Sequence, residues 1–178
     1  MDLNAKVTAT LIAVTAVTAA ITDIRSGKIY NWLTLPLLAL APVWHFAVRG
    51  LPGLWSSLEG LGITAGILLA LALIAGRGLG GGDLKLLAAL GAVGGHPFAL
   101  WMLLFTALSG PVVAVPVMLR RRIVGYTLQN LAMNLAARYA AGQRDVSVAR
   151  GSLGGKLPYG ICIALGALVA IVYPGLHW

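Results

Sequence analysis

The sequence predicts an all-α integral membrane protein, built as a bundle of about six transmembrane helices. Three observations support this fold class: 59% of the 178 residues are hydrophobic, only 10% are charged, and the mean hydropathy is +0.89. Soluble domains carry about 25% charged residues and about 45–50% apolar ones. The composition therefore excludes an ordinary soluble domain, and we expect a single polytopic membrane domain over residues 1–178.

Six apolar segments account for most of the chain. They run over residues 6–24, 31–48, 54–75, 83–94, 97–119 and 157–173. A spanning helix needs about 20 predominantly apolar residues, so the fourth segment is too short to cross a bilayer unaided. It can begin deep in the membrane only if protein or a water-filled cavity surrounds the glycine-rich loop before it. In the third segment, Gly62 and Gly66 have the spacing of small residues at which membrane helices pack closely.

The basic residues indicate the orientation in the membrane. With the N-terminus outside and six alternating crossings, all Lys and Arg residues except Lys6 and Arg49 fall on one side. The positive-inside rule makes that side cytoplasmic. The net charge of +8 is thereby explained without a nucleic-acid partner, and membrane lipids are the expected partner instead. We expect a multi-pass protein of the inner (cytoplasmic) membrane.

The long cytoplasmic loop, residues 120–156, carries an amphipathic pattern. Apolar residues recur every three or four positions from Val124 to Tyr139. This pattern is typical of a helix that lies on the membrane surface. An ordinary helix that covers the bundle fits it equally well, so both alternatives stay open.

Two acidic residues lie at the cytoplasmic ends of membrane segments, namely Asp23 and Asp83. Ionisable groups in a membrane are rare and costly, so each is a candidate for function. The alternative is a structural role, in which the Asp side chain caps a helix or pairs with Arg25 or Arg77.

Two carboxylates on one membrane face suggest the chemistry of an aspartyl protease. One carboxylate activates water, while its protonated partner polarises the scissile carbonyl. The histidines, His45, His96 and His177, show no metal-binding spacing, and the single Cys162 excludes an internal disulfide or a CxxC site. No metal and no cofactor are expected.

The two acids differ in their positions on their own helices. Asp83 opens a segment, where the positive end of the helix dipole favours a carboxylate, and Asp23 is close to the end of one. The sequence therefore predicts that Asp83 is mostly the ionised base and Asp23 the protonated acid. The glycines before Asp83 are expected to let the backbone turn sharply and a substrate strand approach.

Three motifs resemble the type IV prepilin peptidase family. Residues 80–83, GGGD, read as its GxGD motif, and residues 22–31, TDIRSGKIYN, resemble its first Asp motif, with Tyr30 where Pro is common. Residues 156–160, KLPYG, resemble the Pro-aromatic opening of the family's last helix. The motifs occur in the family's order and cover most of the hydrophobic chain.

This resemblance implies a membrane aspartyl endopeptidase that removes the leader peptide of prepilin-like proteins at the cytoplasmic membrane face. Asp23 and Asp83 would be the catalytic pair, without a metal or cofactor. The supporting residues in the same motifs are Gly80, Gly82, Lys85, Asn31 and Pro158. The chain lacks the cysteine-containing insert of larger members, so it is similar to the short peptidase-only type, and N-methylation of the product is not implied.

Two other classes of function are also compatible with paired membrane acids. A proton-coupled carrier can place two carboxylates in a helix bundle, and an assembly protein can keep the fold without chemistry. Presenilin-like proteases share GxGD, but they are larger and their first Asp follows Tyr, whereas Asp23 follows Thr22. The substrate's identity and the oligomeric state do not follow from the sequence.

Overall fold

The computed structural model describes residues 3–75, 80–120 and 159–173, in which every regular element is a helix. These helices are α1 (Leu3–Ser26), α2 (Asn31–Ala75), α3 (Gly81–Arg120) and α5 (Tyr159–Val172). The all-α class is confirmed, whereas the expected six transmembrane helices are not found as six separate elements. The surface-helix prediction concerns residues 124–139, which lie outside the described residues.

The chain divides into two compact units, one formed by residues 1–110 and 158–178 and the other by residues 111–157. The packing described below is that of the first unit alone. The organisation as a single domain stays a prediction.

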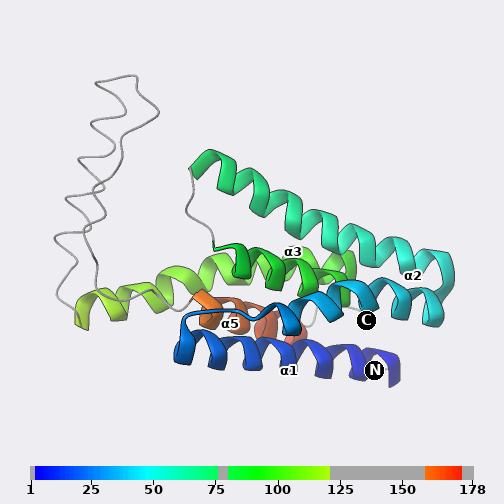
Figure 1. Ribbon diagram of the computed structural model, residues 1–178, viewed down its shortest axis with the longest axis horizontal. Coiled ribbons are helices and arrows are strands. Elements are labelled where there is room, and N and C mark those ends of the chain that lie inside the picture. The colour runs from blue at the N-terminus through cyan, green and yellow to red at the C-terminus, as the bar shows by residue number, and fades with distance from the viewer. Residues whose placement is uncertain (1–2, 76–79, 121–158, 174–178) are drawn as a thin grey trace. The chain divides into compact units, whose positions relative to one another are not determined.

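Helices α2 and α3 each reverse direction at a glycine. Gly50 has a φ of 64° within α2, and Gly95 has a φ of 76° within α3. This left-handed region is readily adopted by glycine, which has no Cβ. Each helix therefore consists of two stretches, and the second runs back along the molecule (Figure 1). Both breaks fall in gaps between apolar segments of the sequence, after residues 48 and 94.

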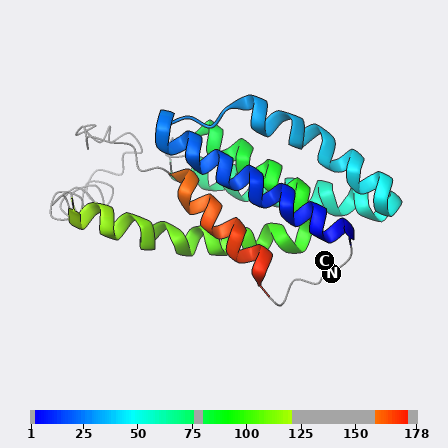
Figure 2. The same ribbon diagram turned by 90° about the horizontal axis from the view of Figure 1, so that it is seen from below.

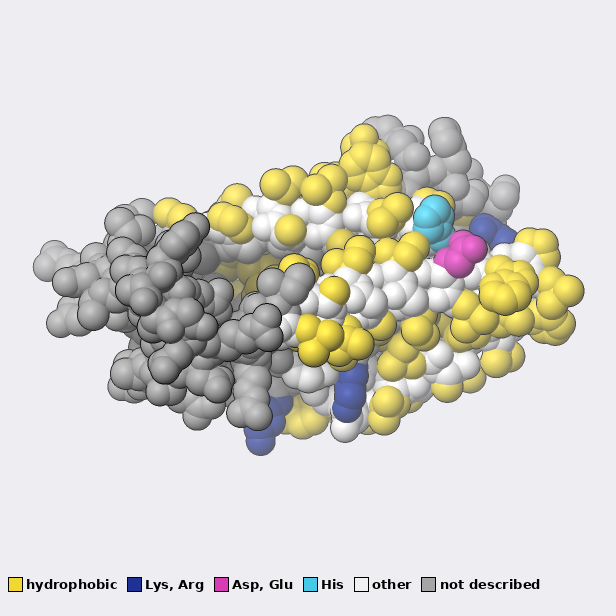
Figure 3. Space-filling view, turned by 90° about the horizontal axis from the view of Figure 1, so that it is seen from above, with side chains coloured by type: hydrophobic (Ala, Val, Ile, Leu, Met, Phe, Trp, Pro, Cys, Tyr) yellow, Lys and Arg dark blue, Asp and Glu magenta, His cyan; other side chains and the backbone are white. Residues whose placement is uncertain are grey.

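Three helices are long and apolar enough to cross a membrane, over Leu3–Ser26, Asn31–Leu73 and Gly81–Val113. The apolar α5 is shorter. Large hydrophobic side chains are exposed on all of these helices, and hydrophobic groups spread over the face in Figure 3, where charged groups are few. A surface of this kind is suited to lipid, as expected for a membrane protein.

Small residues allow α1 and α5 to pack closely. The buried face of α1 consists of Ala5, Thr8, Ala9, Ile12, Thr15, Ala16 and Ala19. The buried face of α5 consists of Gly160, Cys162, Ile163, Ala164, Gly166, Ala167 and Ala170. Membrane helices approach each other best through such small side chains. Both ribbon views show the two helices side by side (Figures 1 and 2).

Glycines also join α2 to α3, but they are not the predicted pair. A Cβ on Gly91 would lie 2.7 Å from the carbonyl oxygen of Gly60, and a Cβ on Gly60 would collide with the carbonyl oxygen of Gly91. A Cβ on Gly62 or Gly66 would meet nothing within 4 Å. The prediction of close packing at Gly62 and Gly66 is therefore not met within the described residues, because no described atom lies within 4 Å of the place where either Cβ would be.

Replacement of Gly91 by Ala should destabilise the protein. The added methyl group has no room against Gly60 and Thr64, and overpacking of this kind costs about 1–3 kcal/mol. Gly66→Ala is the matched control, since its methyl group enters open space in a helix. Thermal unfolding in detergent should give a lower Tm for Gly91→Ala only. Equal melting temperatures for the two variants would contradict this packing.

The break at Gly95 frees backbone carbonyl groups that side chains of α2 then bind. Ser57 Oγ donates a hydrogen bond to the Ala92 carbonyl at 2.8 Å, and His45 Nε2 contacts the Val93 carbonyl at 2.8 Å. Because a carbonyl oxygen only accepts, Nε2 carries the proton. Unpaired carbonyls are costly at a buried helix end and in a membrane. The two side chains therefore stabilise the reversal of α3.

Candidate active site

The structure brings the two predicted catalytic acids together. Asp23 lies in the last turn of α1, and Asp83 lies in the first turn of α3. Their carboxylates are close enough for the charge of Asp23 to act on Asp83. The end of α1 and the beginnings of α3 and α5 gather at the same end of the helices (Figure 1). A pair of interacting carboxylates therefore forms where three helix ends meet.

The beginning of α5 supplies a backbone donor to this pair. The Gly160 N–H donates a hydrogen bond to Asp23 Oδ2 at 2.8 Å. A Cβ on Gly160 would lie 2.9 Å from both Cβ and Oδ2 of Asp23, so only glycine fits at this distance. The neighbouring Tyr159 lies where the charge of Asp83 acts on it. The first turn of α5 thus reaches both acids.

Gly160 is a candidate functional residue that the sequence did not single out. The sequence feature that could have pointed to it is its place in KLPYG, at the start of an apolar segment. Glycine destabilises a helix there, so its presence suggests another reason for a small residue. A glycine at such a position often marks the close approach of another group. Pro158, the supporting residue predicted from this motif, lies outside the described residues.

The glycines before Asp83 provide space. A Cβ on Gly80 would lie 2.7 Å from Asp83 Oδ2, and a Cβ on Gly82 would lie 3.1 Å from Ile29 Cβ. Neither Gly80 nor Gly82 has a positive φ. Residues 76–79 lie outside the described residues, so the sharp turn stays a prediction, and the small size of Gly80 and Gly82 leaves room for the carboxylate and for the α1–α2 link.

Two supporting residues from different motifs are in contact. Lys85 Nζ, in α3, donates a hydrogen bond to Asn31 Oδ1, at the first residue of α2, over 3.2 Å. The first Asp motif and the GxGD motif are therefore joined by a polar contact as well as by the two acids.

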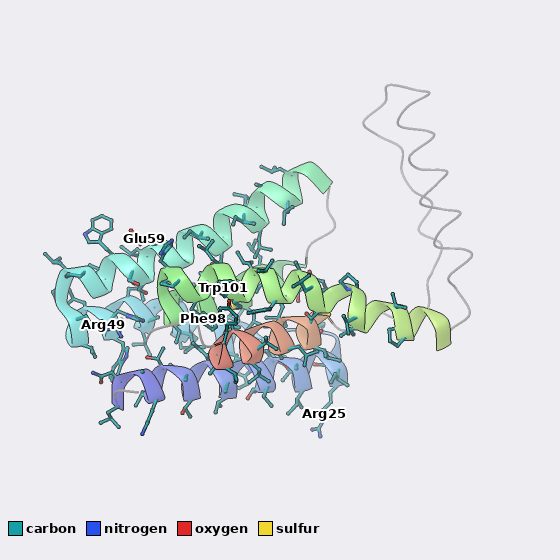
Figure 4. All side chains as sticks on the ribbon, turned by 180° about the vertical axis from the view of Figure 1, so that it is seen from behind. Arg25, Arg49, Glu59, Phe98 and Trp101 are labelled. Carbon is teal, nitrogen blue, oxygen red and sulfur yellow. The ribbon has the colours of Figure 1, made fainter. Side chains whose placement is uncertain are left out.

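The ion-pair alternative for the acids finds no support in the part of the chain that the structure describes, whereas Asp23 does cap a helix, because it accepts the Gly160 N–H in the first turn of α5. Arg25 is exposed and points away from the helices (Figure 4), and it makes no ion pair with Asp23 there. Arg77 lies outside the described residues. Asp83 is the third residue of α3, inside the first turn, where an acidic side chain interacts favourably with the start of its own helix. Within the same ranges, no three His, Cys, Asp or Glu side chains gather to hold a metal ion.

Both carboxylates are close to the beginning of a helix, although Asp23 itself belongs to the last turn of α1. Asp83 is in the first turn of α3, and Asp23 accepts the N–H of Gly160 in the first turn of α5. The assignment of acid and base from the sequence considered only the helix that carries each residue. Asp83 lies where the assignment of acid and base places it, whereas Asp23 has both the end of α1 and the beginning of α5 beside it, so the assignment stays a prediction.

The comparison with protein families gives a match over more than half of the chain. The sequence profile of the type IV leader peptidase family matches residues 10–115, more than half of the 178 residues and a range that includes Asp23 and Asp83. No curated protein and no solved structure matches the chain significantly. With the profile covering most of α1, all of α2 and most of α3, the chain belongs to the type IV leader peptidase family.

Proposed function

We propose that the protein is an aspartyl endopeptidase that removes the leader peptide from type IV prepilin-like proteins at the cytoplasmic membrane face. The observation that carries this proposal is that Asp23 and Asp83, from two different helices within the family-matched range, lie near enough for their charges to interact. Paired carboxylates are the apparatus for direct attack of water on a peptide carbonyl.

The mechanism requires the pair to share one proton. Repulsion between two close carboxylates disfavours the doubly ionised state, so one acid is protonated and the other ionised. The ionised carboxylate takes a proton from water as the oxygen attacks the scissile carbonyl, and the protonated acid donates to the carbonyl oxygen. As the tetrahedral intermediate collapses, the acid that took the proton from water donates it to the leaving amine, and the other carboxylate takes back the proton from the hydroxyl of the intermediate. No covalent enzyme intermediate forms.

The surroundings of the pair are suited to this reaction. The Gly160 N–H holds Asp23 at one oxygen, which fixes the direction of its carboxylate. Gly80 presents no side chain beside the Asp83 carboxylate, so an extended substrate strand can approach the acid there. The substrate would thus meet the Asp23 carboxylate, which is held in one direction, and the Asp83 carboxylate, which has no side chain at position 80 in front of it.

The proposed topology places this end of the helices at the cytoplasmic side of the inner membrane, with six crossings and the N-terminus outside. The reversals at Gly50 and Gly95 divide α2 and α3 into the four middle segments of such a topology. Arg25 is found at the end that carries the acids, whereas Arg49 and Glu59 are at the opposite end (Figure 4). Membrane lipids and prepilin-like substrates are the proposed partners.

Cleavage by the purified protein tests the proposal directly. In detergent, it should cut a prepilin-like substrate once, behind the leader, and mass spectrometry should detect both products. In water enriched with ¹⁸O, the label should enter the new carboxylate of the leader, because hydrolysis places one oxygen of water there. Addition of a chelator should leave the rate unchanged. Folded protein that cleaves nothing would contradict the proposal, and proton uptake by reconstituted vesicles would then favour a carrier.

A further inference from the structure

We propose that Lys85 and Asn31 are positioning residues, whose hydrogen bond holds the α1–α2 link against the beginning of α3 and so sets the approach of Asp83 to Asp23. This inference rests on the proposed function and deepens it, since it assigns a task to two residues that do not carry the chemistry.

The link that leaves Asp23 is short. Residues 27–30 connect α1 to α2, and the Gly27 N–H donates a hydrogen bond to the Asp23 carbonyl at 2.8 Å. Gly27 has a φ of 61°, the left-handed conformation in which glycine commonly ends a helix. The position of this link is therefore coupled to the last turn of α1, which carries Asp23.

The same link contacts α3 at two adjacent places. Ile29 packs on Gly82, where even a Cβ would approach the Ile29 Cβ to 3.1 Å. Two residues further along the chain, Asn31 Oδ1 accepts the hydrogen bond from Lys85 Nζ at 3.2 Å. Gly82 and Lys85 flank Asp83 in the first turns of α3. Each contact therefore joins a neighbour of one acid to a neighbour of the other.

The location of Lys85 is unfavourable for the helix that contains it. A cation near a helix N-terminus opposes the helix dipole, so Lys85 does not stabilise α3 by its charge. Its hydrogen-bond partner in the described ranges is a neutral amide from another helix, and the contact is exposed to solvent. Loss of one exposed hydrogen bond leaves the bundle folded. The contact instead fixes the position of the α1–α2 link relative to the beginning of α3. A shift of this link by a fraction of an ångström would change the distance between Asp23 and Asp83.

The activity test compares kcat with KM. Asn31→Ala and Lys85→Met should each lower kcat by about 10- to 100-fold, because a misplacement of reacting groups by about 1 Å can lower the rate about 100-fold. KM for the prepilin substrate should stay near the wild-type value. The double variant should be no slower than either single variant, since both remove the same contact. Asn31→Asp keeps an acceptor for Lys85 and should restore most of kcat.

Lys28→Met is the matched control. Lys28 belongs to the same link and is exposed, and it has no hydrogen bond or ion pair within the described residues. Its replacement should leave kcat and KM unchanged. A fall in kcat as large as that of Lys85→Met would mean that general loss of positive charge, rather than the contact with Asn31, slows the reaction, and would overturn the inference.

A second measurement separates this inference from the proposed function. A double-mutant cycle on the melting temperatures of the two single variants and the double variant detects the contact without any cleavage. The decrease in Tm of the double variant should be smaller than the sum of the two single decreases. Additive losses in kcat, or an effect on KM alone, would overturn the positioning role. If the wild-type protein cleaved no prepilin while the melting temperatures were less than additive, the contact between Lys85 and Asn31 would exist. The proposed function and the positioning role would then both be overturned.

Discussion

Asp23→Asn and Asp83→Asn variants are expected to lose prepilin processing. Neither acid alone can both accept a proton from water and donate one to the carbonyl, and each proton transfer contributes about 10²–10⁴-fold to the rate. Asn preserves the size of the side chain and the acceptor oxygen that Gly160 requires at position 23. Both variants should therefore insert and melt like the wild type, and cleavage should be followed by mass spectrometry of the products.

Glu59→Gln is the control for this experiment. Glu59 is an exposed acid of α2 at the opposite end of the helices from Asp23 and Asp83 (Figure 4), so it has no access to the scissile bond. Its replacement removes the same charge and should leave processing intact. Normal cleavage of a prepilin by Asp83→Asn would end the protease hypothesis, whatever the behaviour of Glu59→Gln.

Gly160→Ala is expected to have the second-largest effect. The new methyl group would lie 2.9 Å from Asp23 Cβ and Oδ2, closer than carbon atoms and carboxylate oxygens approach, so α5 or Asp23 must shift. The shift also lengthens the hydrogen bond that fixes the Asp23 carboxylate. Misplacement on this scale should lower kcat by about 10²-fold. The rate should be measured with saturating prepilin in detergent.

Gly62→Ala serves as the matched control for Gly160→Ala. Its methyl group enters open space on α2, where it should stabilise the helix by about 0.5–1 kcal/mol and leave kcat unchanged. A Gly160→Ala enzyme that is folded and retains wild-type kcat would show that the first turn of α5 does not position Asp23. A loss of folding instead would be visible as a lower Tm.

Much of the fold was predictable because membrane insertion imposes strong local rules. A long apolar run without charges has few alternatives to a helix, since every backbone group must be hydrogen-bonded within the segment. The starts and ends of the apolar runs accordingly agree closely with the ends of α1 and α3 and with the reversal points at Gly50 and Gly95. Acids are rare in such runs, so residue type and position alone distinguish Asp23 and Asp83 from the rest of the chain.

Packing partners were less predictable, because sequence spacing does not reveal which face of a helix meets another. The spacing of Gly62 and Gly66 suited close packing, yet Gly60 and Gly91 form the contact between α2 and α3. Likewise, His45 had no assigned role, because its acceptor is the Val93 carbonyl, 48 residues away, freed where α3 reverses at Gly95. Such contacts depend on the direction of the helices after each break.

The sequence by itself determined the membrane-helical class, the two acids and the motifs that identify the family. Each of these depends on residue type and local spacing, which the chain carries without folding. Only the tertiary structure decided that the beginning of α5 holds Asp23 through Gly160, that Lys85 reaches Asn31, and that both carboxylates therefore lie close to helix beginnings. These are contacts between residues distant in the chain, and they arise only when α1, α3 and α5 pack together, because a backbone N–H has no sequence signature for the partner it will meet.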